Sequence, residues 1–460
     1  MEQQPVTIII FGGTGDLAEL KLLPALADMA LRDCLPRDVR IVGFSRKPLS
    51  DAEYQAFIER SVAAKDIQAP ASFIASGAYF QGDLTNKASY DELAAYLHQL
   101  DTDRGGCSSK LFYLAVPPAL YDDVFTNIAA AGLTMPCREH GDSQAWTRVL
   151  VEKPFGDDAE HAAYLDARLG TLFHEDQVFR IDHYLAKETL QNILAFRFKN
   201  ALFEPLWNSE HIEHVHIALY ESFGIKKRAH FYDGLGALRD VGQNHILQML
   251  ALIAMEDPLV MDAQTVRAAR AAALEHAVLE GSLDTSVIRG QYAGYRDEPG
   301  VDAESVTETF FRINVAIQTP RWKGTTFTLE SGKALAETAA RITVTFRPRP
   351  GAPDLRNVIT FMVQPNEGIS ISFFVKRPGF ASEVETRQLS FAYPLEVERL
   401  PDAYERVLFD ALRGDQTLFI STAEVHAQWA LIMPILAQWH MLPLITYEQG
   451  VQAGTINGSM

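Results

Sequence analysis

The sequence predicts two domains: an α/β domain with a parallel, doubly wound sheet, followed by a larger α+β domain built on a mainly antiparallel sheet. The chain has 460 residues, which is more than one hydrophobic core usually organises. Apolar strand-like runs alternate with helical stretches over residues 6–151, whereas apolar and polar residues alternate one by one in later segments. We therefore expect a first domain over residues 1–182 and a second over residues 183–460.

The strands of the first domain are expected to be buried on both faces. Residues 6–11, 40–44, 110–116 and 148–151 are almost continuously apolar and rich in β-branched side chains. Helical or loop stretches separate them, and this alternation is typical of a parallel sheet with helices on both sides.

The second domain is expected to contain strands with one buried face. Residues 342, 344 and 346 are apolar with polar neighbours, and residues 369–375 repeat that pattern. Helical periodicity over residues 402–413 and 423–439 predicts two helices, which we expect to cover this sheet.

Composition and charge exclude several classes of protein. Apolar residues make up 47% and charged residues 22% of the chain, as in packed globular proteins. The formal net charge of −18 repels nucleic acid and anionic membrane surfaces, so we expect neither as a partner. The longest nearly apolar run, residues 246–255, is far shorter than the ~20 residues that span a bilayer.

The cysteine pattern predicts reduced thiols. Cys34, Cys107 and Cys137 are odd in number and form no C-x-x-C pair, so neither a disulfide framework nor a zinc site is expected. The first residues carry no basic leader or cleavage site. Both observations favour a cytoplasmic protein.

A glycine turn follows the first predicted strand. Gly12, Gly13 and Gly15 lie between that strand and a helical pattern. Such a turn lets backbone N–H groups and a helix N-terminus approach a pyrophosphate, which predicts a dinucleotide site. The spacing is G-x-x-G-x-x-A, so a tight turn without a ligand is the alternative.

The end of the second predicted strand favours a cofactor with a 2′-phosphate. An NAD enzyme would place an acidic residue there for the ribose hydroxyls, whereas this chain has Ser45, Arg46 and Lys47. Two cations and a hydroxyl suit NADP. Solvated surface charges are the alternative.

Two segments are candidates for the chemistry. Residues 180–188 contain Asp182, His183, Tyr184 and Lys187; on a helix, His183 and Lys187 would share one face and could hold a phosphate. A helix N-cap at Asp182 and a solvated helix face are the structural alternatives. Lys153 follows another strand, where it could meet cofactor or substrate or simply lie at the surface.

The second segment, residues 239–245, heads an apolar helix. Its His245 could take the hydroxyl proton of a sugar as hydride leaves the carbon, or it could be a core histidine with satisfied hydrogen bonds. Asp240 and Gln243 also match a D-x-x-Q capping pattern. Glu221, at the end of a predicted strand, could accept hydrogen bonds from sugar hydroxyls.

We expect no metal site. His211, His214 and His216 resemble a ligand set, but apolar residues alternate with them as in a strand, and no cysteine or carboxylate set completes the site.

These motifs together resemble the glucose-6-phosphate dehydrogenase family, nearly from end to end. The motifs that carry the resemblance are residues 12–18 with Lys21, 111–118, 152–156, 180–188, 239–245, 289–292, 307–310, 332–333, 365–368 and 410–415. The resemblance implies a Rossmann-like NADP domain and an α+β domain whose sheet forms the interface of a homodimer or homotetramer. It also implies an oxidoreductase acting on CH-OH, which oxidises C1 of glucose 6-phosphate to the lactone and opens the oxidative pentose phosphate pathway.

Residue roles carry over by position. The resemblance implies His245 as the general base and Asp182 as the carboxylate that orients it. It implies phosphate contacts from His183, Tyr184 and Lys187, and sugar contacts from Glu221, Asp240 and Lys333, with Lys153 reaching both ligands. The cofactor-binding set is Gly12, Gly13, Thr14, Gly15, Asp16, Leu17, Lys21, Ser45, Arg46, Asp83, Leu84, Pro117 and Lys153.

Several positions depart from the family pattern. Glu330 stands where the family typically has Arg, and Thr338 where it has Lys or Arg, so two cations are missing near the predicted sugar site. Ala186 replaces a usual Gly, and Gly242 replaces a larger residue inside the predicted catalytic helix. The alternatives are therefore the same hydride transfer on another sugar phosphate or hexose, or a non-catalytic regulatory paralogue.

Overall fold

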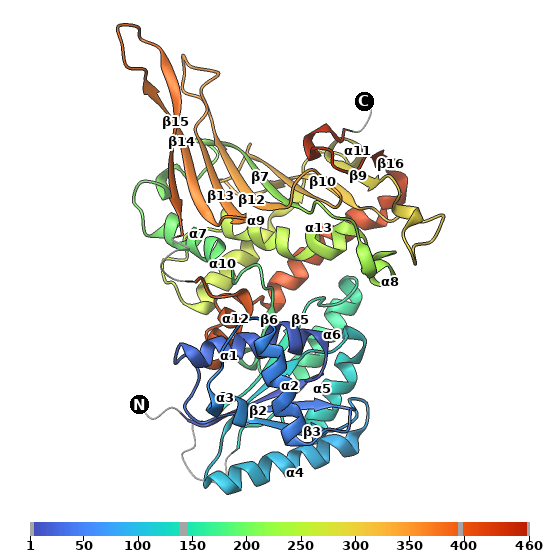
Figure 1. Cartoon of the computed structure of the whole chain (residues 1–460). Helices are drawn as coiled ribbons and strands as arrows, with labels where there is room; N and C mark the ends of the chain where they lie inside the picture. The colour runs from blue at the N-terminus through green and yellow to red at the C-terminus, as the bar shows by residue number, and fades with distance from the viewer. Residues whose placement is uncertain (1–3, 138–144, 394–398, 458–460) are drawn as a thin grey trace. The chain divides into compact units, whose positions relative to one another are not determined.

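The computed structural model describes residues 4–137, 145–393 and 399–457 (Figure 1). Its backbone forms two compact units. Unit 1 comprises residues 1–186 and 401–422, and unit 2 comprises residues 187–400 and 423–460.

Unit 1 is built on a six-stranded parallel sheet with the order β3-β2-β1-β4-β5-β6. The strands are β1 (Val6–Phe11), β2 (Val39–Ser45), β3 (Gly77–Gln81), β4 (Ser109–Leu114), β5 (Thr147–Glu152) and β6 (Val178–Ile181). The chain leaves β1 in one direction toward β2 and returns on its other side to β4. Ligands of such sheets bind beyond the carboxyl ends of the strands at this switch point.

Each face of this sheet has its own core because successive side chains of a strand point to opposite faces. Ile8 and Ile10 pack in the core on one face, whereas Ile9 and Phe11 pack in the core on the other. The first core is closed by α1 (Leu23–Leu31), α2 (Asp51–Ala63), α3 (Ala71–Ala75) and α12 (Ala403–Arg413). The second is closed by α4 (Lys87–Arg104), α5 (Tyr121–Ala130) and α6 (Ala159–Leu172).

Helix α12 differs from the sequence prediction. Its apolar face was expected to cover the antiparallel sheet, but Val407, Leu408 and Ala411 pack in the core of unit 1 with α1. A capping box between Asp402 and Glu405 starts the helix, and Gly414 ends it with φ of 78°. The sequence pattern correctly predicted a helix with one buried face. The sheet against which that face packs was predicted wrongly.

Unit 2 is built on a ten-stranded sheet with the order β15-β14-β13-β12-β7-β11-β10-β9-β16, in which β8 pairs with β10. The pairs β7–β11 and β9–β16 are parallel and the other pairs are antiparallel. The strands are β7 (Ile212–Tyr220), β8 (Ala277–Leu279), β9 (Val287–Tyr292), β10 (Phe310–Ile317), β11 (Thr326–Gly332), β12 (Ala339–Phe346), β13 (Val358–Gln364), β14 (Gly368–Lys376), β15 (Val384–Ala392) and β16 (Leu444–Tyr447). The predicted fold class is confirmed.

Helices cover one face of the unit 2 sheet (Figure 1). They are α7 (Glu188–Phe198), α9 (Leu247–Ala254), α10 (Ala263–Glu275) and α13 (Thr422–Ala437). Unit 2 also contains the short helices α8 (Ala229–Tyr232) and α11 (Leu283–Ser286). Every residue of α9 is buried. Arg270 of α10 and Glu424 of α13, both fully buried, form an ion pair of 2.8 Å that ties two of these helices together.

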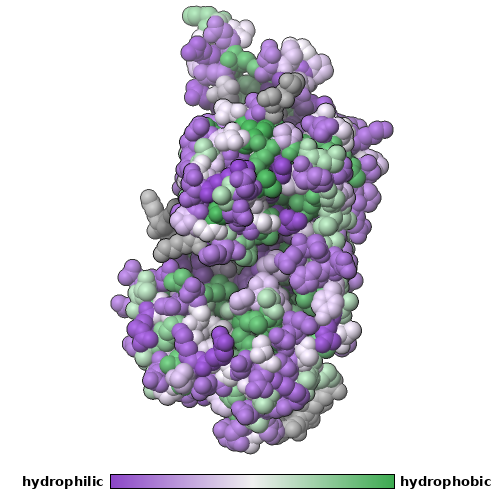
Figure 2. Space-filling model, turned by 90° about the vertical axis from the view of Figure 1, so that its right-hand side faces the viewer, coloured by the Kyte–Doolittle hydropathy of each residue, from purple (hydrophilic) through white to green (hydrophobic). Residues whose placement is uncertain are grey.

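The outer part of the unit 2 sheet is more exposed. Strand β15 leaves Val384, Leu389 and Phe391 about half exposed or more. In the view of Figure 2, hydrophilic side chains cover most of the surface and leave hydrophobic patches between them. Among the described residues, no helix has the length and apolar character needed to cross a membrane.

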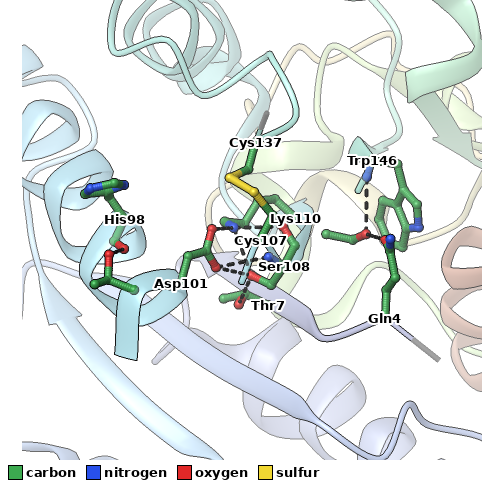
Figure 3. The surroundings of a disulfide bond; sticks show 11 residues. Gln4, Thr7, His98, Asp101, Cys107, Ser108, Lys110, Cys137 and Trp146 are labelled. Atoms are coloured by element: carbon green, nitrogen blue, oxygen red, sulfur yellow. Dashed lines mark hydrogen bonds and ion pairs between the residues drawn. A yellow bond between two sulfur atoms is a disulfide. The ribbon is translucent and has the colours of Figure 1, made fainter. Parts of the chain in front are cut away.

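The cysteine prediction is wrong for two of the three residues. Cys107 and Cys137 form a disulfide with Cα atoms 5.6 Å apart (Figure 3). Cys34 is free and exposed. Thirty positions separate the two cysteines in sequence. Spacing gave no signal because only the fold brings the end of the α4–β4 connection close to the segment after α5.

A buried polar cluster lies beside this disulfide (Figure 3). The Lys110 ammonium lies 2.7 Å from the Asp101 carboxylate, which also accepts a hydrogen bond of 2.6 Å from the Ser108 hydroxyl. Burial lowers the pKa of Lys110, opposed by the attraction of Asp101. The cluster thus satisfies a charge that the core of unit 1 would otherwise leave unpaired.

Candidate functional site

The glycine turn after β1 is shaped by close backbone contacts. Gly12 has φ of +81°, and a Cβ there would lie 2.3 Å from the carbonyl oxygen of Ala115. A Cβ on Gly13 would lie 2.6 Å from the Cα of Gly43. Only glycine fits at either position, so the turn presents bare backbone at the switch point of the sheet.

Three backbone N–H groups of this turn already donate to carbonyls of the protein itself. Gly12 and Gly13 both donate to the carbonyl of Phe44, at 2.9 and 3.2 Å, and Gly15 donates to the carbonyl of Gly12 at 2.9 Å. A π-helical turn, Ala18–Leu22, follows and leads into α1. It carries the predicted cofactor residue Lys21, whose ammonium lies 3.8 Å from the Asp402 carboxylate.

The ends of β2 and β3 meet the glycine turn. The hydroxyls of Thr14 and Ser45 lie 2.8 Å apart, and the Ser45 hydroxyl lies 2.9 Å from that of Tyr79. Arg46 is exposed beside them. The N–H and hydroxyl of Thr85 donate to the Asp83 carboxylate and lower its pKa, with a smaller contribution from the Arg46 charge. Three predicted cofactor residues, Thr14, Ser45 and Arg46, are therefore neighbours.

The remaining predicted cofactor residues lie at the same carboxyl edge of the unit 1 sheet. Asp16 is exposed and Leu17 half-buried after the glycines. The carbonyl of Leu84 accepts a hydrogen bond of 2.9 Å from the Tyr90 hydroxyl, and Pro117 is exposed after β4. Lys153 follows β5 and precedes a cis peptide bond to Pro154.

Glu152, next to Lys153, is a partly buried acid that the sequence interpretation missed. Its carboxylate accepts a hydrogen bond of 2.6 Å from the Tyr113 hydroxyl. Burial raises the pKa of Glu152 to about 7, with the nearby Asp182 charge adding to the increase and Tyr113 and Lys153 opposing it. The hydroxyl of Tyr404, from α12, is a further hydrogen-bond partner. The partners come from other strands and helices, so the motif around Lys153 carried no signal for them.

Asp182 directly follows β6 and is 1% exposed. Its carboxylate accepts a hydrogen bond of 2.9 Å from the N–H of Tyr184. Residues 183–186 form a turn and α7 begins only at Glu188, so the expectation that His183 and Lys187 share a helix face is wrong. The alternative of Asp182 as a helix N-cap is also wrong, because the N-cap of α7 is Lys187.

In unit 2, His245 and Asp240 lie inside a π-helix, Leu238–Ile246, that continues into α9. Asp240 does not cap this helix, whose N-cap is Ala237. His245 is 2% exposed. π-Helical turns widen the helix and are frequent at functional sites. A Cβ on Gly242 would lie 2.8 Å from both the Leu238 side chain and the ring of Phe311, which explains the small residue there.

Three predicted sugar contacts of unit 2 form one charged cluster. The Lys333 ammonium forms a short ion pair with Glu221 and lies 3.6 Å from the Asp240 carboxylate. Arg228 contacts the other oxygen of Asp240 at 3.3 Å. The parallel pairing of β7 and β11 brings Tyr220 opposite Gly332, so the residues that follow them, Glu221 and Lys333, lie side by side.

Both positions that depart from the family pattern have protein partners, but only Glu330 has a cation beside it. Glu330 is 2% exposed and accepts a hydrogen bond of 2.6 Å from Arg312, so the reversed charge is paired. Burial alone would raise the pKa of Glu330, but the nearby His216 ring and the hydrogen bond from Arg312 lower it to about 2. Thr338 accepts a hydrogen bond of 2.9 Å from the N–H of Ser222, beside Glu221.

The histidines of β7 have protein partners. His214 lies 2.9 Å from the Thr328 hydroxyl, and His216 lies 3.5 Å from the Glu330 carboxylate.

Comparison with known proteins gives the same family over both units. Residues 9–192 match the NAD binding domain of glucose-6-phosphate dehydrogenase, and residues 194–457 match its C-terminal domain. A Mycobacterium tuberculosis protein named glucose-6-phosphate 1-dehydrogenase 2 is 39% identical and covers 97% of this chain and 91% of its own length. The Arabidopsis thaliana protein named glucose-6-phosphate 1-dehydrogenase 5, cytoplasmic, is 36% identical and covers 98% and 90%.

Solved structures agree with these relatives. The structure described as glucose-6-phosphate dehydrogenase in complex with its substrate glucose-6-phosphate superposes with a TM-score of 0.89 at 31% identity, and covers 98% of this chain and 96% of the other. A glucose-6-phosphate 1-dehydrogenase from Mycobacterium avium gives a TM-score of 0.83 at 30% identity, with 98% and 95% covered.

Proposed function

Because the chain belongs to the glucose-6-phosphate dehydrogenase family, we propose that it oxidises D-glucose 6-phosphate at C1 to 6-phospho-D-glucono-1,5-lactone and reduces NADP. This is the first step of the oxidative pentose phosphate pathway. The observation that carries the proposal is the Glu221, Asp240 and Lys333 cluster, which the fold assembles beside the π-helix of His245. Residues 1–182 would form the cofactor domain, to whose core α12 is added, and the rest of residues 183–460 would form the domain for substrate binding and dimerisation.

His245 is the proposed general base. A neutral imidazole takes the proton of the C1 hydroxyl while the C1 hydrogen leaves as hydride, so that C1 and its oxygen become the lactone carbonyl. The bound nicotinamide supplies the hydride acceptor. Asp182 is the proposed carboxylate that accepts from the other ring nitrogen, which fixes the tautomer of His245 and stabilises the imidazolium.

The sugar is held through its hydroxyls and its phosphate. Glu221 and Asp240 lie beside Lys333, and carboxylates that keep a cation nearby are strong acceptors for sugar hydroxyls. His183, Tyr184 and Lys187 are the proposed donors to the phosphate. Lys153 is proposed to contact both the substrate and the cofactor.

The glycine turn fits a dinucleotide because a Cβ would fill the space at Gly12 and Gly13. Gly12 and Gly13 donate their N–H groups to Phe44 of β2 and Gly15 donates within the turn, so we propose that the N–H groups of Thr14, Asp16 and Leu17 face the pyrophosphate. Thr14, Ser45 and Arg46 would bind the 2′-phosphate, which supports NADP over NAD. Lys21, Asp83, Leu84 and Pro117 complete the proposed cofactor site.

The reaction is tested by mixing the purified chain with NADP and glucose 6-phosphate and following reduced cofactor by absorbance. His245→Asn is expected to lower kcat by about 10²- to 10⁴-fold while KM for the sugar changes little. His276→Asn, at the exposed end of α10, is the matched control and should leave kcat unchanged. Full activity of His245→Asn would refute the role of base.

Cofactor choice is tested separately. Arg46→Ala should raise KM for NADP by about tenfold, the value of one charge-assisted contact, and leave KM for NAD unchanged. Arg60→Ala, an exposed cation on α2, serves as control. An Arg46→Ala variant with unaltered KM for NADP would contradict the assignment. A panel of other hexose phosphates and free hexoses tests the alternative substrates.

We also propose a homodimer or homotetramer formed through the unit 2 sheet, in the cytoplasm. The exposed side chains of Val384, Leu389 and Phe391 on β15 support an interface there. The Arabidopsis relative is named as cytoplasmic, which supports the location.

A further inference from the structure

The backbone of Lys333 is held by two neighbours that lie far from it in the sequence. Its N–H donates to the carbonyl of Thr309 at 2.9 Å, and its carbonyl accepts from the Tyr447 hydroxyl at 2.7 Å. Tyr447 is 5% exposed and ends β16, the edge strand of the sheet. The position of this lysine therefore depends on the last part of the chain.

Residues 444–457, which we call the C-terminal segment, run along the residues that follow Lys333. The N–H of Gly450 donates to the carbonyl of Ala334 at 2.8 Å, and the N–H of Ala336 donates to the carbonyl of Val451 at 2.9 Å. Leu335 and Val451 form a parallel bridge. The segment thus frames the loop that carries Lys333 by main-chain hydrogen bonds.

Arg312 fastens the far end of the C-terminal segment. Its guanidinium donates to the carbonyl of Ile456 at 3.1 Å and to that of Ala453 at 2.9 Å. The Nε–H of the same guanidinium donates to the Glu330 carboxylate at 2.6 Å. Glu330 is itself held by the hydroxyl of Tyr220 at 2.7 Å, so the planar guanidinium has one orientation that satisfies all of these acceptors.

We propose that Glu330 and Arg312 are positioning residues for substrate binding. They fix the position of the C-terminal segment, and the segment holds Lys333 beside Glu221 and Asp240. This proposal rests on the proposed function, because Lys333 is a sugar contact there. An arginine at position 330 would face Arg312 across the strand pair and leave that group without its orienting acceptor. The unusual acid at this position then has a reason specific to this chain.

The test compares steady-state kinetics of three variants, each of which weakens a different one of these contacts. Arg312→Gln removes the donors to Ile456 and Ala453, Glu330→Gln keeps an acceptor but removes the charge, and Tyr447→Phe removes only the hydroxyl on the Lys333 carbonyl. KM for glucose 6-phosphate is expected to rise about tenfold in Arg312→Gln and about threefold in the other two, because small misplacements of a contact are costly. KM for NADP should change by less than about twofold.

A matched control separates positioning from general loss of stability. Arg347 also donates to two backbone carbonyls, those of Ser209 and Gly324, but it follows β12, at the end of the β7–β12 pair opposite to Tyr220. Arg347→Gln should leave KM for the sugar unchanged, and thermal midpoints of all variants are measured alongside.

A double variant tests whether the effect passes through Lys333. In the Lys333→Met background, Arg312→Gln should raise KM for the sugar by less than about twofold further, since coupled residues are not additive. Equal effects of Arg312→Gln with and without Lys333 would overturn the inference, and so would wild-type KM in both Arg312→Gln and Tyr447→Phe. If the wild-type chain itself does not oxidise glucose 6-phosphate, the proposed function fails and this inference fails with it.

Discussion

Replacing Glu152 by Gln should make the chain more stable at high pH, and the gain should depend on pH. In the folded chain, burial and the nearby Asp182 charge favour the protonated carboxyl of Glu152, and its pKa is about 7 against an ordinary value of 4.5. Glutamine can still accept the hydrogen bond of the Tyr113 hydroxyl but never takes up the charge. The variant therefore removes only the cost of ionising a partly buried acid.

The size of the effect follows from linkage between proton binding and folding. Because the folded pKa lies above the unfolded one, the stability that the protonated group confers is complete below about pH 4.5 and is lost as pH rises through about 7. At about 1.36 kcal/mol for each pH unit between the two values, the full loss is about 3 kcal/mol. The free energy of unfolding of Glu152→Gln should exceed that of the wild type by a small amount at low pH and by about 3 kcal/mol well above pH 7.

Urea unfolding in a series of buffers from about pH 5 to about pH 8.5 measures this difference, a range chosen to bracket the folded pKa. Glu53→Gln is the control. Its capping hydrogen bonds with Ser50 lower the pKa of Glu53, so the stability that it contributes is already present above its ordinary pKa, and the loss in the variant should be nearly constant across this range. A difference between Glu152→Gln and wild type that stays flat with pH would refute the reasoning.

Three further outcomes are expected. Gly242→Ala should lower the free energy of unfolding by about 1–3 kcal/mol in urea titrations, because the clash with the Phe311 ring outweighs the ~1 kcal/mol gain in helix propensity; a stabilised variant would contradict this. Cys107→Ser should cost about 3 kcal/mol by the same measurement, in line with the loop that the disulfide closes, whereas Cys34→Ser should be neutral; equal stabilities would contradict it. Leu389→Lys should convert the proposed oligomer to monomers in light-scattering chromatography, and a mass equal to that of the wild-type chain would exclude the proposed interface.

The first unit was largely predictable because its strands are buried on both faces. Continuous apolar runs predicted β1, β2, β4 and β5, and the glycines after β1 located the switch point. Strands β3 and β6 were not predicted, since each has only four or five residues and includes polar side chains. Short edge strands give little periodicity, and neighbouring strands rather than local sequence determine them.

The candidate site was less predictable where backbone geometry decides it. Residues 183–186 have helical spacing but form a turn, because Asp182 accepts the Tyr184 N–H and the chain must leave β6. The π-helix around His245 has the same periodic apolar pattern as an α-helix, so the sequence could not distinguish them. Glu152 was missed because its pKa depends on burial among groups from β4 and α12.

Charge at the proposed sugar site shows why single positions mislead. Seen alone, Glu330 reverses a cation, but in the register of β10 and β11 it lies directly opposite Arg312, so its charge is paired on this face of the sheet. The two residues are still not interchangeable. Arginine has five donors and can hold a carboxylate and two carbonyls at once, whereas a glutamate at position 312 could donate to neither Ile456 nor Ala453. Position 312 contacts the C-terminal segment and must therefore carry the cation. The acid of the pair then stands at position 330.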